Sequence, residues 1–192
     1  MNSSFEADLL PHIQSEYSKQ WEIILRLQDQ DPKLREALVD IFDHAKRGVI
    51  VDVGCGQGNA MATLFSTVNA KYIGVDPARR TTKTHIEGAE FVEDDIVSFL
   101  QDRNRFQQFK TYSSRNFMFN GVDSIATSIP FNDLAEMLVF YQNPGDYIFG
   151  IYSPEMVDAL RNMTDIYEEA YEYYPSKNHF FAFRMKRMQN KP

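Results

Sequence analysis

A short apolar run that leads directly into a glycine-rich turn is the feature that most restricts how this chain can fold. Residues 49–59 read VIVDVGCGQGN. The apolar run predicts a buried strand, and the glycines at positions 54, 56 and 58 permit positive φ angles and a close approach of a ligand to the backbone. A helix that begins after this turn would present unpaired backbone N–H groups to the same ligand. The segment therefore predicts a strand, a ligand-holding turn and a helix in succession.

The spacing of these glycines and a nearby carboxylate indicate which ligand the turn suits. A dinucleotide-binding turn prefers the pattern G-x-G-x-x-G, which would place a small residue at Asn59. The spacing here is G-x-G-x-G, and Asp52 puts a carboxylate at the tip of the strand. That carboxylate would repel a pyrophosphate but would attract an ammonium or sulfonium group. The alternative is a glycine-rich connection that binds no ligand.

The next two predicted strands also end in acidic residues. Asp76, followed by Pro77, stands about as far from the glycine turn as a carboxylate that binds ribose hydroxyls. Asp95, followed by Ile96, could bind an adenine amino group. Each aspartate could instead be the N-cap of a helix. Taken with the glycine turn, the two acids favour a nucleoside-binding interpretation.

Beyond residue 48, short apolar runs alternate with stretches of helical period, the pattern of βα units and a parallel sheet. Strands are expected at 49–53, 71–75, 90–93, 122–127 and 146–152. Two further runs, 167–174 and 179–187, flank a turn-rich connector and predict a closing antiparallel hairpin. The polar segment 101–120 is expected to be a helix followed by a loop. The fold class is thus α/β: a mostly parallel seven-stranded sheet with helices on both faces and a C-terminal antiparallel β-hairpin.

Two helices are expected before this sheet, in an N-terminal helical extension. Apolar residues recur there at helical spacing, and Asp31-Pro32 suits the start of the second helix. Tyr17 and Trp21 lie one helical turn apart. These two aromatic side chains would either cover a bound ligand or substrate, or fasten the helix to the sheet.

Composition narrows the class of protein. A net charge of −7 over 192 residues gives no general attraction for nucleic acid, so such a partner would need a local basic patch. No signal peptide or membrane-length apolar run is evident, and the single cysteine, Cys55, excludes an internal disulfide. The four histidines have no metal-ligand spacing, so no metal site is expected. We expect a cytoplasmic, single-domain protein with a helical extension at 1–46 and an α/β core at 47–188.

These motifs, in this order, resemble the class I S-adenosylmethionine-dependent methyltransferase family over about residues 48–187. The resemblance implies a Rossmann-like fold and S-adenosyl-L-methionine as the cofactor. In that family the glycine turn holds the methionine part, an acid placed as Asp76 holds the ribose, and residues placed as Asp95 and Ile96 contact adenine. The cofactor-binding residues implied in this way are Asp52, Gly54, Cys55, Gly56, Gly58, Asp76, Pro77, Asp95 and Ile96.

The segment after the expected fourth strand bears on the methyl acceptor. Family members that methylate amino groups carry Asn, Asp or Ser, then two prolines, then an aromatic residue. Ser128-Ile129-Pro130-Phe131 is similar, although Ile129 replaces the first proline. Ser128 and Phe131 are therefore the candidate catalytic residues on the acceptor side, and an ordinary turn at the end of a strand is the alternative.

The resemblance implies an enzyme that transfers a methyl group to an RNA, a protein or a small molecule. Transfer from a sulfonium leaves a neutral thioether, so positioning and exclusion of water can supply much of the catalysis. One alternative is a catalytically silent module that binds the cofactor or its product, S-adenosylhomocysteine, and serves as a partner subunit or scaffold. Another is a nicotinamide-dependent oxidoreductase, which the glycine spacing disfavours.

Overall fold

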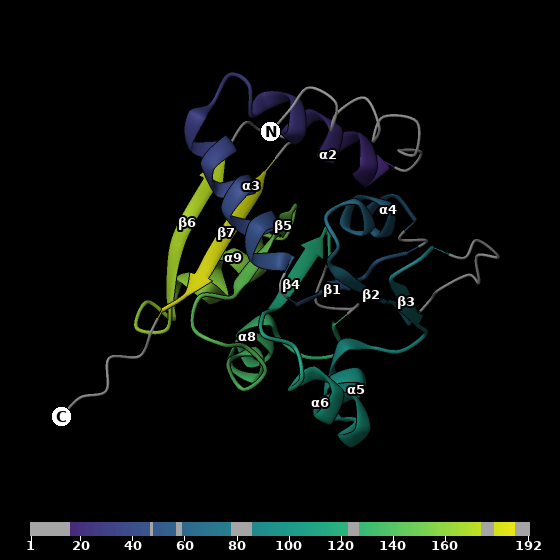
Figure 1. Cartoon of the computed structure of the whole chain (residues 1–192). Helices are drawn as coiled ribbons and strands as arrows, with labels where there is room; N and C mark the ends of the chain where they lie inside the picture. The colour runs from purple at the N-terminus through teal and green to yellow at the C-terminus, as the bar shows by residue number, and fades with distance from the viewer. Residues whose placement is uncertain are drawn as a thin grey trace.

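The protein is an α/β structure in which helices cover both sides of one sheet (Figure 1). The computed structural model describes residues 16–46, 48–56, 59–77, 86–122, 127–173 and 179–186. The described helices are α2 (Glu16–Leu27), α3 (Pro32–Ala45), α4 (Asn59–Thr67), α5 (Ile96–Gln101), α6 (Arg103–Phe109), α8 (Phe131–Val139) and α9 (Pro154–Arg161). The strands are β1 (Val49–Val53), β2 (Lys71–Val75), β3 (Ala89–Val92), β4 (Arg115–Asn120), β5 (Tyr147–Ile151), β6 (Tyr167–Tyr173) and β7 (Phe180–Met185).

The seven strands form a single sheet in the order β3-β2-β1-β4-β5-β7-β6. The pairs from β3 to β5 are parallel, whereas β7 runs antiparallel to both β5 and β6. The predicted parallel sheet with a closing antiparallel hairpin is confirmed. The chain moves outward from β1 to β3 and then crosses back to β4, so the strand order reverses between β1 and β4. Ligands of open α/β sheets bind beside the carboxyl ends of the strands at such a switch point.

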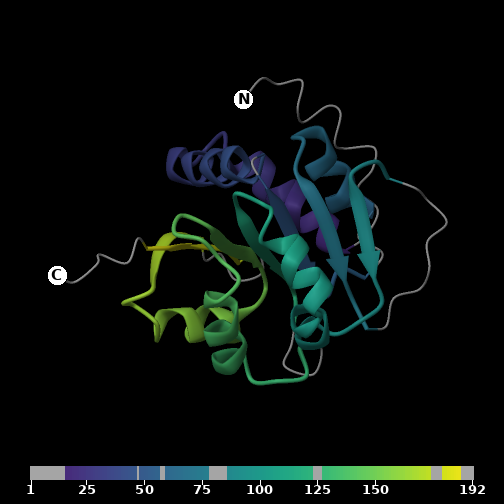
Figure 2. The same ribbon diagram turned by 60° about the horizontal axis from the view of Figure 1, so that its bottom comes forward.

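Each face of the sheet is covered by its own group of helices. Figure 1 shows α2, α3 and α4 on one side of the strands and α5, α6 and α8 on the other, and the turned view of Figure 2 brings the second group forward. All five residues of β1 are buried. Val49, Val51 and Val53 pack into the core on the α5–α9 side, and Ile50 packs into the core on the α2–α4 side. This burial on both faces explains why β1 reads as a nearly continuous apolar run.

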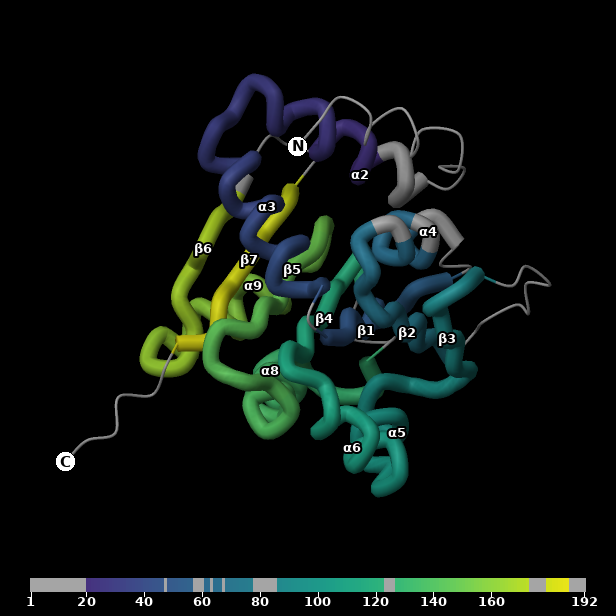
Figure 3. The backbone as a smooth tube through the Cα atoms, viewed as in Figure 1, coloured from purple at the N-terminus to yellow at the C-terminus, as the bar shows by residue number. Residues whose placement is uncertain are grey.

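The N-terminal helices pack on the sheet and are tied to its far edge. Helix α3 begins at Pro32, as predicted, and Asp31 caps it, because its side chain accepts hydrogen bonds from the backbone N–H groups of Lys33 and Leu34. Its other carboxylate oxygen accepts a hydrogen bond of 2.6 Å from the Tyr171 hydroxyl of β6. The path of the backbone tube in Figure 3 shows how α2 and α3 lie across the same side of the sheet.

The expected fourth strand at 122–127 is wrong: β4 is Arg115–Asn120, and the described residues 122 and 127 are outside any strand. This part of the sequence reads as polar because Asn116 and Asn120 flank the aromatic run. Both asparagines are buried, however, and their side-chain amides are hydrogen-bonded within the sheet. The predicted helix-and-loop segment 101–120 therefore contains α6 and a central strand.

The other strand predictions are confirmed to within two residues at each end of the element. β1 and β2 have the expected bounds, and β3, β5, β6 and β7 differ slightly from theirs. Positions 174 and 187, at the ends of the expected hairpin strands, lie outside the described residues. Within the described ranges, no helix has both the length and the hydrophobicity needed to cross a membrane.

Candidate functional site

The glycine turn leaves β1 and folds over the end of β2. Gly54 and Gly56 have φ angles of 70° and 53°, which confirms the left-handed backbone expected at these two positions. The backbone N–H groups of Gly54 and Cys55 both donate to the carbonyl oxygen of Val75, at 2.8 and 3.3 Å. Two consecutive amides thus hold the turn against the last residue of β2. Gly58 lies outside the described residues.

Asp76 lies directly against this turn. One of its carboxylate oxygens accepts a hydrogen bond of 2.8 Å from the backbone N–H of Gly56. Its own backbone N–H donates to the carbonyl oxygen of Val92, the last residue of β3. The side chain is only partly buried, and the following Pro77 is exposed. The structure therefore brings together the glycine turn and the acid that the sequence analysis assigned to one site.

A missing side chain in β2 lets the turn lie this close to the sheet. A Cβ atom added at Gly74 would stand 2.7 Å from the Sγ atom of Cys55 and 2.8 Å from a ring carbon of Phe91. Both distances are shorter than real contacts of a Cβ atom. Gly74 thus provides the space in which the Cys55 side chain packs on the strand below the turn.

Asp52 lies beneath the turn rather than at its surface. Its side chain is 1% exposed and accepts hydrogen bonds from the Tyr72 hydroxyl at 2.5 Å and the Asn120 side-chain amide at 3.2 Å. Burial raises the pKa of Asp52 to about 7, although these two hydrogen bonds act to lower it. The negative charge of Asp76 raises this pKa further. Asp52 is therefore a buried carboxyl group whose charged form needs additional stabilisation.

Sequence analysis missed Asn120 and the contact that Trp21 makes with it. Asn120 is the last residue of β4, and its side-chain oxygen accepts a hydrogen bond of 3.0 Å from the indole N–H of Trp21. Trp21 also packs edge-on against Phe149 and Phe180, so it does fasten α2 to the sheet. The Asn-Gly pair that follows the aromatic run of β4 is a turn signal that could have marked the end of this strand.

Asp95 lies at the same edge of the sheet, but its carboxylate caps a helix. One oxygen accepts hydrogen bonds from the backbone N–H groups of Val97 and Ser98, and the other accepts one from the Ser98 hydroxyl. Burial acts to raise the pKa of Asp95, but these hydrogen bonds outweigh it, so the pKa is lowered. The side chain of Ile96 is 1% exposed and belongs to the core. The alternative role of Asp95 as a helix cap is thus realised.

Ser128 and Phe131 do not directly follow the fourth strand, which ends earlier, at Asn120. Ser128 is exposed and has a φ of 64°. Phe131 opens α8, is 5% exposed and packs edge-on against Phe119, with 6.5 Å between the ring centroids. The prediction that this motif directly follows the fourth strand is therefore wrong, and the Phe131 ring is part of the hydrophobic core. A role of Ser128 and Phe131 on the acceptor side stays a prediction. The described part of the chain contains no cluster of three or more His, Cys, Asp or Glu side chains arranged to hold a metal ion.

Comparison with solved structures places this arrangement among known folds. Over 92% of its length the chain superposes on MycE, a methyltransferase from the mycinamycin biosynthetic pathway in complex with Mg and SAH, with a TM-score of 0.53 and 11% identity. The chain spans about half the length of MycE, with 50% of that chain covered by the match. The ribosomal protein L11 methylase from Lactobacillus delbrueckii subsp. bulgaricus gives a TM-score of 0.53 at 15% identity, with 79% of this chain and 77% of that chain covered.

A third similar structure is the antibiotic-resistance methyltransferase Kmr, with a TM-score of 0.50, 16% identity and coverage of 80% of this chain and 93% of that chain. No protein-family model matches the sequence. No curated protein matches it either. The likeness is therefore one of fold, at identities too low to transfer the chemistry of any of these proteins.

Proposed function

We propose that this chain, which has the class I methyltransferase fold, binds S-adenosyl-L-methionine beside β1 and β2 and transfers its methyl group to an acceptor. The observation that carries the proposal is the hydrogen bond between the Gly56 backbone N–H and the Asp76 carboxylate. It unites the turn suited to the methionine part with the acid suited to the ribose. MycE, which shares the fold, was crystallised with SAH.

The residues of the site fit this cofactor. Asp76 lies against the glycine turn at the end of β2, and a carboxylate at this position is suited to accept hydrogen bonds from ribose hydroxyls. The turn presents two glycines in left-handed conformations, which let a ligand approach the backbone. Asp95 and Ile96 at the end of β3 border the position proposed for adenine, where contacts would come from the backbone, since the Ile96 side chain lies in the core.

The charges at this edge of the sheet also suit a cationic cofactor. Asp52 and Asp76 give the turn a negative potential, which favours the sulfonium and ammonium groups of S-adenosylmethionine and disfavours a pyrophosphate. A cation near Asp52 stabilises its charged form, because opposite charges lower the pKa of a carboxyl group. We therefore expect affinity to increase as the pH rises through about 7, where Asp52 ionises.

The acceptor is assigned to the end of β4. The carboxyl end of this strand lies beside that of β1, with Phe119 opposite Val53. Asn120 and Gly121 follow at once, and Gly121 adopts a φ of 65°. The cofactor, when bound, supplies an activated methyl group on sulfur. The contribution of the chain is to hold the acceptor in line with that group and to exclude water.

Calorimetric titrations with S-adenosylmethionine, S-adenosylhomocysteine and NAD test the binding step. S-adenosylhomocysteine should bind the wild type, and Asp76→Ala should weaken it about a hundredfold, because hydrogen bonds to a charged group are lost. Asp43→Ala is a matched control, since Asp43 is an exposed acid on α3 that pairs with Lys46. It should leave the affinity unchanged. Preferential binding of NAD, or equal affinity of Asp76→Ala and wild type, would contradict the proposal.

Methyl transfer is tested separately, with S-adenosylmethionine that carries a labelled methyl group and with RNA, protein and small-molecule acceptors. Label that appears in one acceptor class, and that falls with Asp76→Ala, supports an enzyme. Tight cofactor binding with no transfer to any class would instead support a catalytically silent module.

A further inference from the structure

Four buried polar side chains connect the N-terminal helix α2 to the floor of the glycine turn. Trp21 of α2, Asn120 of β4, Asp52 of β1 and Tyr72 of β2 are 0%, 6%, 1% and 0% exposed. The Trp21 indole donates to Asn120, Asn120 donates to Asp52, and the Tyr72 hydroxyl donates to the other oxygen of Asp52. We call this set the buried relay. It joins residues that lie 99 and 68 positions apart in the sequence.

The chemistry of the indole fixes the direction of the relay. An indole N–H can only donate, so the group of Asn120 that faces Trp21 must be its carbonyl oxygen. The NH₂ group of Asn120 must then point to Asp52, where it stabilises a carboxylate. If the amide were reversed, its oxygen would face the carboxylate oxygen of Asp52, and two acceptors would repel each other.

We propose that Trp21 is a positioning residue of the cofactor site, and that the N-terminal helix α2 is thereby part of that site. Trp21 holds the Asn120 amide in the orientation that donates to Asp52, and Asp52 supplies negative charge beneath the turn. The proposal rests on the proposed function, since it assumes that a cationic cofactor binds above Asp52.

The packing of Trp21 does not depend on its indole N–H, which has the separate role of binding Asn120. The contacts with Phe149 and Phe180 need only an aromatic ring, which a phenylalanine would also supply. Without the indole N–H, the buried oxygen of Asn120 loses its partner and the amide is free to turn away from Asp52. The charged form of Asp52 then loses one of its two hydrogen bonds. Binding of a cationic ligand should consequently require a higher pH.

The groups that face Asp52 make this pH dependence interpretable. The titratable groups that influence it are Tyr72, which donates a hydrogen bond, and Asp76, whose negative charge opposes ionisation. Among the described residues, no cationic side chain forms an ion pair with Asp52. A change in the pH profile on replacement of Trp21 therefore reports on the Asn120 hydrogen bond.

The test compares Trp21→Phe with wild type in calorimetric titrations of the full chain across about pH 6 to pH 9. The ligands are S-adenosylmethionine, which carries the sulfonium charge, and S-adenosylhomocysteine, whose one cation is its α-ammonium group. Tyr167→Phe is the matched control, because it also deletes one buried donor, the hydroxyl that binds Gln142 at 2.7 Å near the opposite edge of the sheet. Trp21→Phe should weaken binding about tenfold at neutral pH and move the binding profile to higher pH. Tyr167→Phe should leave both unchanged. Loss of affinity without a shift of the profile would overturn the positioning role.

Wild-type fluorescence gives a second measurement that needs no variant. Trp21 is the single tryptophan of the chain, so indole emission reports on the surroundings of this one ring, including its hydrogen bond to Asn120. Saturation with S-adenosylhomocysteine should change this emission, and an unchanged spectrum at saturation would overturn the inference. If S-adenosylhomocysteine does not bind the wild type at all, the proposed function fails. If it binds wild type and Trp21→Phe with the same pH profile, only the role of Trp21 fails.

Discussion

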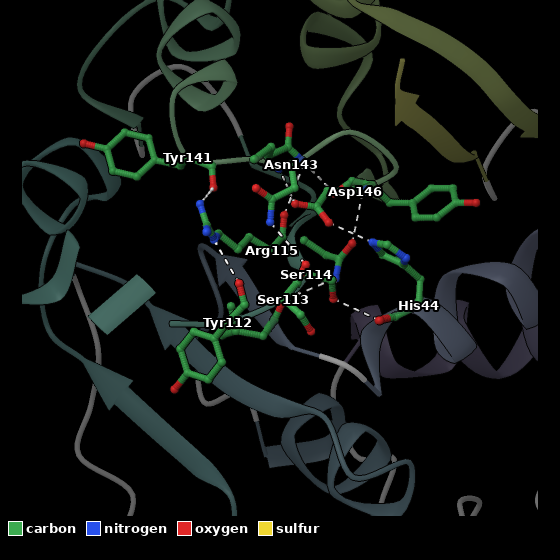
Figure 4. Close-up of polar contacts among 12 residues, drawn as sticks. His44, Tyr112, Ser113, Ser114, Arg115, Tyr141, Asn143 and Asp146 are labelled. Carbon is green, nitrogen blue, oxygen red and sulfur yellow. Dashed lines mark hydrogen bonds and ion pairs between the residues drawn. The ribbon is translucent and has the colours of Figure 1, made fainter. Parts of the chain in front are cut away.

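The two edges of the sheet each contain a buried aspartate, and the two are held in different ways. Asp146, at the amino edge before β5, is 0% exposed and contacts the His44 ring at 2.7 Å and the Asn143 backbone N–H at 2.5 Å (Figure 4). Asp52, at the carboxyl edge, is equally buried but receives only two neutral donors. At the amino edge the carboxylate is held by an imidazole ring and a backbone N–H. At the carboxyl edge it is held by a phenol hydroxyl and a side-chain amide, beneath the proposed ligand site.

The remaining polar groups of the amino edge are bonded to one another. Figure 4 shows the Arg115 guanidinium against the carbonyl oxygens of Tyr112 and Tyr141, and the Ser114 hydroxyl donates to the carbonyl oxygen of His44. Such contacts join the chain before β1, β4 and β5 into one structural unit. The comparison indicates that the polar contacts of the amino edge stabilise the fold, and it leaves the carboxyl edge, with its turn of glycines, as the place of the proposed ligand site.

Among substitutions at the two edges, Asp52→Asn should change the free energy of unfolding the most. The pKa of this carboxyl group in the folded protein, about 7, lies above its ordinary value of 3.8. Below about pH 4, Asp52 is protonated in the folded and the unfolded protein, and the stability associated with this carboxyl group is fully present. That stability is lost as the pH rises through about 7. Relative to wild type, Asp52→Asn should gain roughly 4 kcal/mol in the free energy of unfolding between those limits. Urea unfolding at several pH values measures this, and parallel pH profiles would contradict it.

Asp146→Ala should destabilise the protein, in contrast to the stabilisation expected for Asp52→Asn. Removing this carboxylate takes a buried partner away from the His44 ring and from the backbone N–H of Asn143. The free energy of unfolding should therefore fall by about 3 kcal/mol. The affinity of the folded protein for S-adenosylhomocysteine should change little. A large loss of affinity at a temperature where the variant is folded would show that the edges are not separate in function.

Gly74→Ala probes the close contact between the turn and β2. The new methyl group would meet the Sγ atom of Cys55 and the Phe91 ring, so stability should fall by about 2 kcal/mol and the turn should be displaced. Adding Cys55→Ala removes one of the two clashes and should restore part of the stability and of the cofactor affinity. Strict additivity of the two substitutions would indicate that Cys55 and Gly74 do not interact.

Tyr167→Phe should have the smallest effect. It deletes one buried hydrogen bond, to Gln142, and should lower the free energy of unfolding by about 1 kcal/mol without changing cofactor affinity. Thermal unfolding and one calorimetric titration suffice. An affinity that falls with this substitution would mean that loss of stability alone weakens binding, and the interpretation of every variant at the carboxyl edge would need revision.

Local sequence patterns predicted much of the fold, and they identified the glycine turn and Asp76, which the structure brings together. β1 and β2 were located correctly because each is a short apolar run that ends at a turn, and the glycines and Asp76 follow these strands directly. β4 was missed because its asparagines look exposed in the sequence. Asn116 can be buried because its side-chain amide donates to the carbonyl oxygen of Val49 and accepts from the backbone N–H of Tyr147, both on neighbouring strands. Local patterns cannot reveal such partners.

The same reason explains what was missed at the site. The contact between Trp21 and Asn120 spans 99 positions and exists only after α2 packs on the sheet. The burial of Asp52 likewise depends on its neighbouring strands, because Tyr72 and Asn120 come from β2 and β4. The sequence identified a carboxylate at the tip of a strand, but only the fold shows it below the turn with a raised pKa.

Hydrogen exchange measured with and without S-adenosylhomocysteine tests the division between the two edges most directly. Saturation should slow amide exchange at Gly54–Gly56 and around Asp76, where the ligand would cover the turn. Exchange at 141–147, on the amino edge, should not change. Protection of 141–147 instead, or no protection of the glycine turn at a saturating concentration of ligand, would contradict a cofactor site at the carboxyl ends of β1 and β2.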